Sequence, residues 1–181
     1  HPLKSPLLSY IIYDKVSNMM IGEAMRILVM SDCHMAIANA ERVLEKHGDI
    51  KHVFFLGDGA SAIDEMKSYH TDKSFHIVSG NCDMFSTFPD YGETVIDGVR
   101  IAYMHGHRYG VKYGTESLFK LAQSINASLV LYGHTHIASV EYRDGIYVIN
   151  PGALSGSREG PNGYAVIDVT SQGIVPSIMK I

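Results

Sequence analysis

The sequence has few cysteines, no block of basic residues and no apolar run of membrane-spanning length. The two cysteines, Cys33 and Cys82, do not suggest a disulfide framework, so we expect a reducing, cytoplasmic setting. We expect both to be space-fillers, the alternative being that they make a nearby site sensitive to oxidation. The apolar stretch from Leu7 to Tyr13 is far shorter than the roughly 20 residues of a membrane span, so no membrane partner is expected.

The charge balance argues against binding to a nucleic-acid polymer. The formal net charge is −4, whereas non-specific binding to a polyanion requires a positive surface. We therefore expect no nucleic-acid polymer as a partner. Small nucleotides remain candidate substrates, because bound metal ions can supply positive charge locally.

No internal repeat or linker divides the 181 residues, which suffice for one domain with a full core. The chain starts with His1, and Met25 directly precedes the first apolar run. We expect residues 1–24 to be an upstream extension or a cloning remnant that is dispensable for folding. Residues 25–181 are expected to form the domain.

Five apolar runs, each followed by a polar motif, are the most informative feature of the chain. The runs are rich in β-branched and aromatic residues and show almost no alternation, which is typical of strands buried on both faces. They are Arg26–Met30, His52–Leu56, Phe75–Val78, Ile101–Met104 and Leu129–Tyr132. Polar residues after such strands fall on loops at the carboxyl edge of a sheet. The motifs are Asp32-Cys33-His34, Gly57-Asp58, Gly80-Asn81-Cys82-Asp83, His105-Gly106-His107 and Gly133-His134-Thr135-His136.

Taken singly, most of these motifs have a simpler explanation as a helix cap, a turn or a satisfied histidine. The pair His134 and His136 is the exception, because burying two imidazoles without a partner is costly. The joint appearance of all five motifs indicates a site for two divalent metal ions that cut a phosphate ester. Manganese is the expected metal, and nickel, iron, cobalt and zinc are also compatible with these ligands.

Seven side chains fit such a pair of ions. One ion is assigned to Asp32, His34 and His136, the other to Asn81, His105 and His134, and Asp58 bridges them.

The remaining pattern predicts the elements around the site. Helices are expected over residues 36–47 and 61–69, and a third behind an N-cap at Thr115. Strands over 139–143 and 146–149 are expected to form a hairpin with a tight turn at Asp144-Gly145, and residues 163–169 a further strand. This order favours a mixed α/β sandwich.

The order D-x-H, G-D, G-N, H, G-H-x-H resembles the calcineurin-like metallophosphoesterase superfamily, from Met25 to the end of the chain. Gly80-Asn81-Cys82-Asp83 and Asn150-Pro151-Gly152 are most similar to its YfcE-type phosphodiesterases. The resemblance implies an α/β fold, a four-layer αββα sandwich of two mixed β-sheets. It also implies hydrolysis of small phosphodiesters by a hydroxide that bridges the two metals.

The resemblance suggests roles for residues around the ligands. Many members have a histidine, the general acid for the leaving group, where this chain has Cys82, so good leaving groups are expected. As catalytic residues we name Asp83, which orients the loop or accepts a proton, and His107, which contacts substrate. Asn81 and Arg158 are the expected phosphate-binding residues, although a solvated loop arginine is an equal interpretation of Arg158.

Two other functions remain open. One is a non-catalytic scaffold or interaction protein on the same fold, for which the retromer subunit of the superfamily is a precedent. The other is a phosphomonoesterase. Small members of the family often self-associate, so a homodimer or a higher homo-oligomer is expected.

Overall fold

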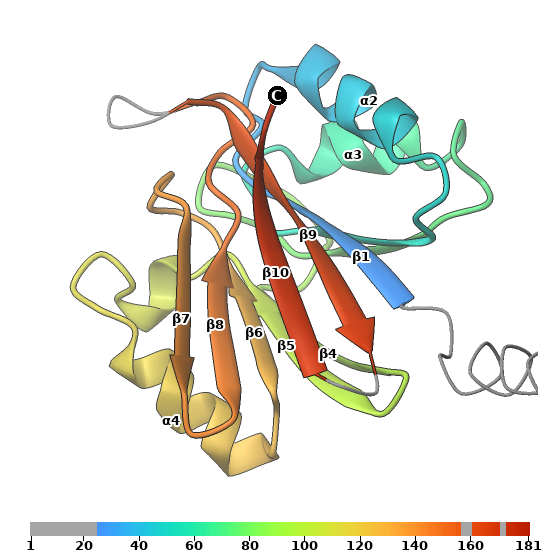
Figure 1. The fold of residues 1–181 in the computed structure, drawn as a ribbon. Coiled ribbons are helices and arrows are strands. Elements are labelled where there is room, and N and C mark those ends of the chain that lie inside the picture. The colour runs from blue at the N-terminus through green and yellow to red at the C-terminus, as the bar shows by residue number, and fades with distance from the viewer. Residues whose placement is uncertain (1–24, 157–160, 171–172) are drawn as a thin grey trace, which may run out of the picture.

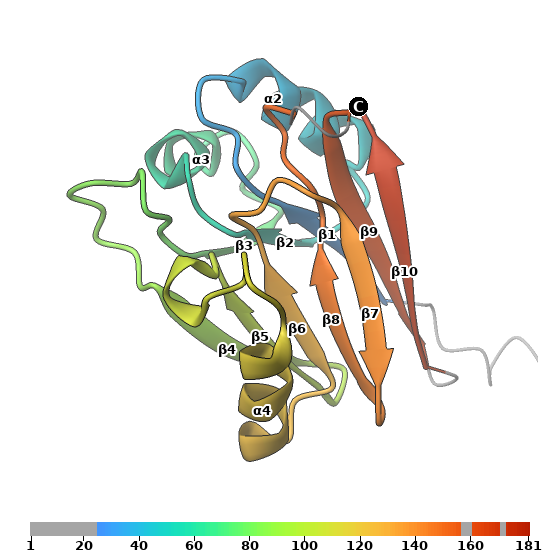
Figure 2. The same cartoon turned by 90° about the vertical axis from the view of Figure 1, so that its left-hand side faces the viewer.

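The structure is a computed structural model that describes residues 25–156, 161–170 and 173–181. In this part of the chain, two five-stranded sheets lie face to face and helices cover their outer faces (Figures 1 and 2). The predictions for residues 1–24 and for Arg158 concern positions outside the described residues.

The first sheet has the strand order β10-β9-β1-β2-β3. Strands β1, β2 and β3 are parallel to one another, whereas β9 is antiparallel to both β1 and β10. The bounds are β1 (Met25–Met30), β2 (His52–Phe55), β3 (Ser74–Ile77), β9 (Gly163–Thr170) and β10 (Gly173–Lys180).

The second sheet has the order β4-β5-β6-β8-β7, in which β5, β6 and β8 are parallel and the edge strands are antiparallel to their neighbours. Its strands are β4 (Tyr91–Ile96), β5 (Val99–Met104), β6 (Leu129–Tyr132), β7 (Ser139–Arg143) and β8 (Ile146–Asn150).

Three apolar layers hold the sandwich together. Helices α2 (Ile37–Lys46) and α3 (Ala60–Met66) pack on the outer face of the first sheet, and α4 (Glu116–Ile125) packs on the outer face of the second. Between the sheets lies a buried layer that includes Ile27, Val29, Phe54, Leu129, Leu131 and Ile167. Burying apolar surface on both faces of each sheet is the main force that brings the layers together.

The predicted αββα sandwich of two mixed sheets is confirmed. The three helices, the hairpin at Asp144-Gly145 and the strand at 163–169 are present within a few residues of their predicted bounds. Thr115 is the N-cap residue of α4, as predicted, but its hydroxyl donates to Glu141 and caps no helical N–H.

Strands β4 and β10 were not predicted, and β3 is less deeply buried than predicted. Strand β4 contains Gly92 and lies at a sheet edge, and β10 contains Pro176, which only an edge strand accepts. Strand β3 is also an edge strand, so its residues are only partly buried before Ile77.

Because the central strands of each sheet are parallel, their carboxyl ends lie at one edge of the sandwich. Strands β1, β2 and β3 end there in one sheet and β5, β6 and β8 in the other, so the loops that follow them share this edge (Figure 1). Among the described residues, no helix has the length and apolar character needed to cross a bilayer.

Candidate metal centre

Main-chain hydrogen bonds join the loops that carry the motifs. The N–H of Asp32 donates to Gly57 at 3.0 Å, and that of His34 donates to Asp58 at 2.9 Å. In the second sheet, the N–H of Gly133 donates to His105 at 3.0 Å. Each loop therefore holds its neighbour, which fixes the side chains more firmly than separate surface loops would.

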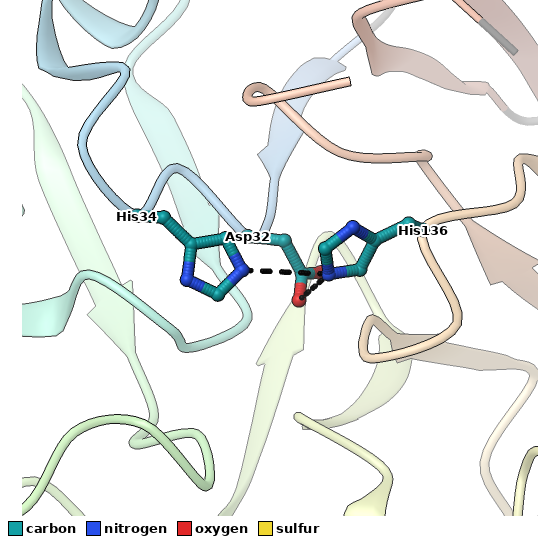
Figure 3. Close-up of side chains that lie close together, drawn as sticks. All are labelled: Asp32, His34 and His136. Carbon is teal, nitrogen blue, oxygen red and sulfur yellow. Dashed lines mark hydrogen bonds and ion pairs between the residues drawn. The ribbon is translucent and has the colours of Figure 1, made fainter. Parts of the chain in front are cut away.

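Asp32, His34 and His136 form the first cluster (Figure 3). The Nε2 atom of His136 lies 3.1 Å from Asp32 Oδ1 and 3.4 Å from His34 Nε2. Figure 3 shows the two rings reaching toward the carboxylate from separate loops. Among the described residues, Asp32 Oδ1 is buried and has no hydrogen-bond partner, although it forms the ion-pair contact with His136. The other oxygen, Oδ2, accepts from the hydroxyl of Ser31 and the N–H of His134.

Asn81, His105 and His134 form the second cluster. His105 Nε2 lies 3.1 Å from Asn81 Oδ1 and 3.2 Å from His134 Nδ1. His105 Nδ1 lies 2.7 Å from the carbonyl oxygen of Leu56, which can only accept, so Nδ1 carries a proton. Nε2 then faces the Asn81 oxygen, and where Nε2 carries no proton a cation between the two acceptors would satisfy both.

Asp58 lies between the two clusters. Its Oδ2 is 3.8 Å from His34 Nε2 in the first cluster and 3.5 Å from His105 Nε2 in the second. Its Oδ1 accepts the N–H of Cys82 at 2.8 Å, which leaves Oδ2 as the oxygen directed at both sets of imidazoles. This is the position that a bridging carboxylate occupies.

The spacing of these atoms fits metal ions of ordinary size. Two ligand atoms about 2.1 Å from one ion are about 3.0 Å apart in octahedral geometry and about 3.4 Å apart in tetrahedral geometry. The contacts within the two clusters span 3.1 to 3.4 Å. The orphaned Asp32 oxygen and the facing acceptors at His105 are both features that a bound cation would satisfy.

Backbone conformation supports the same site. Nine non-glycine residues of the described chain have positive φ, and five of them are predicted ligands: Asp32, His34, Asp58, His134 and His136. A left-handed backbone costs an L-residue roughly 1–2 kcal/mol, so it persists only where the surroundings impose it. Strain of this kind concentrates at functional sites, and here it coincides with the residues that sequence motifs single out.

The ionisation states also suit cation binding. Burial opposes ionisation of Asp32, but the neighbouring His136 and His105 and the Ser31 hydroxyl outweigh it and hold its pKa below the usual value. Burial, together with the charges of His105 and Lys112, lowers the pKa of His134 to about 4. Its imidazole is therefore neutral at pH 7, the form that binds a metal.

Asp83 holds the backbone around the clusters. Its Oδ1 accepts the N–H groups of Gly59 and Ala60, and its Oδ2 accepts those of Asp58 and Gly80, at 2.7 to 3.0 Å. With both oxygens engaged, Asp83 orients the loop, the first of the two roles named for it. The geometry offers no free oxygen for the second role, acceptance of a proton.

Asn150 is a positioning residue to which the sequence pattern assigned no role. It is buried at the end of β8, and its amide donates to the carbonyl of Gly133 at 2.8 Å and to the Thr135 hydroxyl at 3.1 Å. It thereby fixes the loop that carries His134 and His136. A buried asparagine directly after an apolar strand, as here before Pro151, was the available signal.

The remaining predicted residues lie around the clusters. The ring of His107 is 5.4 Å from that of His105, and its Nδ1 is buried with no hydrogen-bond partner among the described residues. Cys33 is buried in the core, and burial with nearby carboxylates raises the pKa of its thiol to about 11. Cys82 is exposed, so its prediction as a space-filler is wrong. Its sulfur groups with the ligand atoms of His34 and Asp58, a third cluster that the motifs did not predict.

Comparison with known proteins places this geometry in a family. The model of the calcineurin-like phosphoesterase superfamily domain matches residues 25–172. The chain belongs to that superfamily. The predicted recognition is confirmed, and the structure has candidate metal-ligand clusters of the kind that this metal-dependent family uses.

Relatives of this chain include a protein named as a phosphodiesterase and a protein named for vacuolar protein sorting. Phosphodiesterase YfcE of Escherichia coli is 28% identical over 169 residues, which cover 80% of this chain and 88% of the relative. Vacuolar protein sorting-associated protein 29 of Schizosaccharomyces pombe is 30% identical over 161 residues, covering 86% and 83%. A predicted phosphoesterase from Streptococcus pneumoniae superimposes with a TM-score of 0.77 at 25% identity, covering 88% of this chain and 91% of that structure.

Proposed function

We propose that this protein hydrolyses small phosphodiesters with good leaving groups, using two divalent metal ions held by the seven clustered side chains. The observation that carries the proposal is Asp58 Oδ2, which lies within 4 Å of imidazoles from both clusters. A carboxylate oxygen shared in this way favours a pair of ions over a single one. Two bound ions would supply a water nucleophile at neutral pH and positive charge for the phosphoryl oxygens.

Some side chains around the clusters position the ligand loops, and others are placed to contact substrate. Asp83 and Asn150 hold the ligand loops by their hydrogen bonds to main-chain groups. The amide nitrogen of Asn81 remains on the solvent side, where it donates to the Cys82 sulfur at 3.3 Å, and it can donate to a phosphoryl oxygen. His107, with its unpartnered buried Nδ1, is the nearest additional imidazole to the second cluster.

The preference for good leaving groups rests on Cys82. Partial loss of hydration and the neighbouring Asp58 raise the pKa of the thiol above its usual value, so the thiol is a weaker acid than an imidazolium. A departing alkoxide would therefore receive little help from this position. Aryl alcohols are acidic enough to leave without it.

Metal analysis paired with a substrate panel tests the proposal. The protein is stripped of metal, reloaded with manganese, nickel, cobalt or zinc, and assayed on bis(4-nitrophenyl) phosphate and 4-nitrophenyl phosphate. We expect two ions per chain and faster turnover of the diester. Loss of activity on chelation should be reversed by adding the metal back. A loaded protein that cleaves only the monoester would replace the proposal with the phosphomonoesterase alternative.

A scaffold function is the second candidate, favoured by the similarity to a vacuolar protein sorting-associated protein. Exposed apolar side chains directly after the ligand motifs, Met35, Met84, Phe85 and Ile137, give this edge a surface that a protein partner could cover. A metal-loaded protein that is inert towards every diester and monoester would favour this function over hydrolysis.

A further inference from the structure

A hollow lies beside the candidate metal centre, on the side of the second sheet. It has a volume of about 540 Å³, within the range of small-molecule sites. Thr135 and Ile137 form part of its wall, so it adjoins the loop that carries His134 and His136. A substrate held at the metal centre could therefore extend one ester arm into this hollow.

Two opposite charges line the hollow. Lys112 stands on the side of the metal centre, since the preceding Val111 lies against Gly106, the residue directly after the ligand His105. Glu141 stands on β7 and uses Oε2 to accept the hydroxyl of Thr115 at 2.9 Å. Within the described ranges, neither Lys112 Nζ nor Glu141 Oε1 has a hydrogen-bond or ion-pair partner.

The other walls are apolar or already paired. Val111 and Ile137 contribute apolar surface. The hydroxyls of Tyr132 and Ser139 bond to each other at 2.9 Å, and Thr135 is engaged by Asn150. The hollow therefore offers a ligand an apolar wall against which methylene groups can pack. It also offers the Lys112 cation near the phosphate and the free Oε1 of Glu141 beyond it.

We propose that this hollow binds an ester arm that carries an ammonium group, with Glu141 facing the ammonium and Lys112 facing the phosphate. The assignment rests on the proposed function, because it supposes a phosphodiester at the metal centre. It specifies that function further, since it names zwitterionic diesters of short amino alcohols as the preferred substrate class. An unpaired carboxylate attracts an ammonium group more strongly than it attracts a neutral hydroxyl, and the apolar walls can pack against the methylene groups of the arm.

Three 4-nitrophenyl phosphodiesters test the proposal, because they share a leaving group and differ only in the second arm. The arms are 2-aminoethyl, the nearly isosteric propyl, and 2-carboxyethyl. We expect kcat/KM to be about threefold to fivefold higher for 2-aminoethyl than for propyl, as for a partly exposed ion pair. The 2-carboxyethyl ester should be the poorest of the three, and the differences should shrink at high salt.

Glu141→Gln is the decisive variant, since the amide keeps an acceptor for Thr115 and removes only the charge. We expect it to lower the ratio of kcat/KM for the 2-aminoethyl ester over the propyl ester to about one. Glu65→Gln, on the exposed side of α3, is the matched control and should retain the preference. Lys112→Met should lower kcat/KM for all three esters by a similar factor. A preference that survives Glu141→Gln would overturn the assignment.

Binding separates this assignment from the proposed function. The 2-aminoethyl ester of methylphosphonic acid cannot lose an aryl group, so calorimetry can measure its affinity with or without metal. Glu141→Gln should weaken its binding about threefold to fivefold in either state. Turnover without any arm preference would contradict the ammonium site alone. Absence of turnover would contradict the proposed function, and the calorimetric comparison would then decide the site independently.

Discussion

The two ends of the parallel strands use left-handed backbone for different purposes. At one end, Asp97 and Asp144 each precede a glycine in a tight turn between antiparallel strands, where aspartate accepts positive φ at little cost. At the other end, histidines and aspartates adopt the same conformation in loops that bring their side chains together, the aspartates buried and the histidines partly buried. Within the part of the chain that the structure describes, left-handed backbone coincides with a buried, unsatisfied polar atom only at Asp32 in the candidate metal centre.

The inter-sheet core explains how the chain sustains such a site. The core strands between the sheets are regular and almost wholly apolar, with side chains such as Ile27, Phe54 and Leu131 fully buried. Their stability is available to hold the ligand loops in conformations that the loops would not choose alone. Changes at the ligand end should therefore affect metal binding first, and changes at the turn end should affect stability alone.

The largest difference is expected between two isosteric substitutions of left-handed aspartates. Asp58→Asn keeps the oxygen that accepts the Cys82 N–H but removes the charge between the clusters. It should lower kcat at least about 100-fold and reduce the metal content to one ion or less per chain, measured by turnover and elemental analysis. Asp97→Asn, at the turn end, should change neither. Full activity in Asp58→Asn would contradict the bridging role.

Glycines at the two ends should also differ. A Cβ at Gly133 would collide with the Ser31 hydroxyl and approach Asp32, whereas a Cβ at Gly145 meets only open space. We expect Gly133→Ala to cost about 2–3 kcal/mol of unfolding free energy and to impair metal binding. Gly145→Ala should cost about 1 kcal/mol, from its positive φ alone, and should leave metal binding intact. Urea unfolding with metal titration measures both, and equal losses would remove the distinction between the two ends.

Substitutions at Cys82 test whether the ligand end lacks a general acid for the leaving group. Cys82→His should raise the rate on an alkyl ester relative to an aryl ester by about tenfold, below the 10²–10⁴ of an evolved general acid. Cys82→Asn, which has no proton to give, serves as the control. The measurement is the ratio of kcat/KM for the two leaving groups with the same metal. An unchanged ratio in Cys82→His would exclude this position as the place for the acid.

The smallest effect is expected from a substitution at Phe85. This residue has left-handed backbone, as the ligands do, but its side chain is exposed. It has a φ of +68° in the turn that the N–H of Ser86 closes onto Asp83, and its ring is 98% exposed. Glycine is the usual residue at the left-handed third position of such a turn. Phe85→Gly should therefore raise the unfolding free energy by about 0.5–1 kcal/mol without changing metal content. A loss of stability would mean that the ring makes contacts that offset the strain.

The strand ends were predictable because apolar runs before polar motifs leave a clear pattern. His134 and His136 stood out for this reason, and the structure brings them together with Asp32 and His105. The asparagine that ends an apolar run marked Asn150 as a candidate polar contact, but one asparagine does not reveal which loop it will bond. Strand β10 was missed because Pro176 is compatible only with an edge, a position that depends on long-range pairing.

Anomalous scattering from crystals of the manganese-loaded protein tests the central claim most directly. The account predicts two ions per chain about 3.5–4 Å apart, with an oxygen of Asp58 between them. One ion should contact Asp32 and His136, and the other His105 and His134. A single ion, or ions bound away from these side chains, would contradict the account.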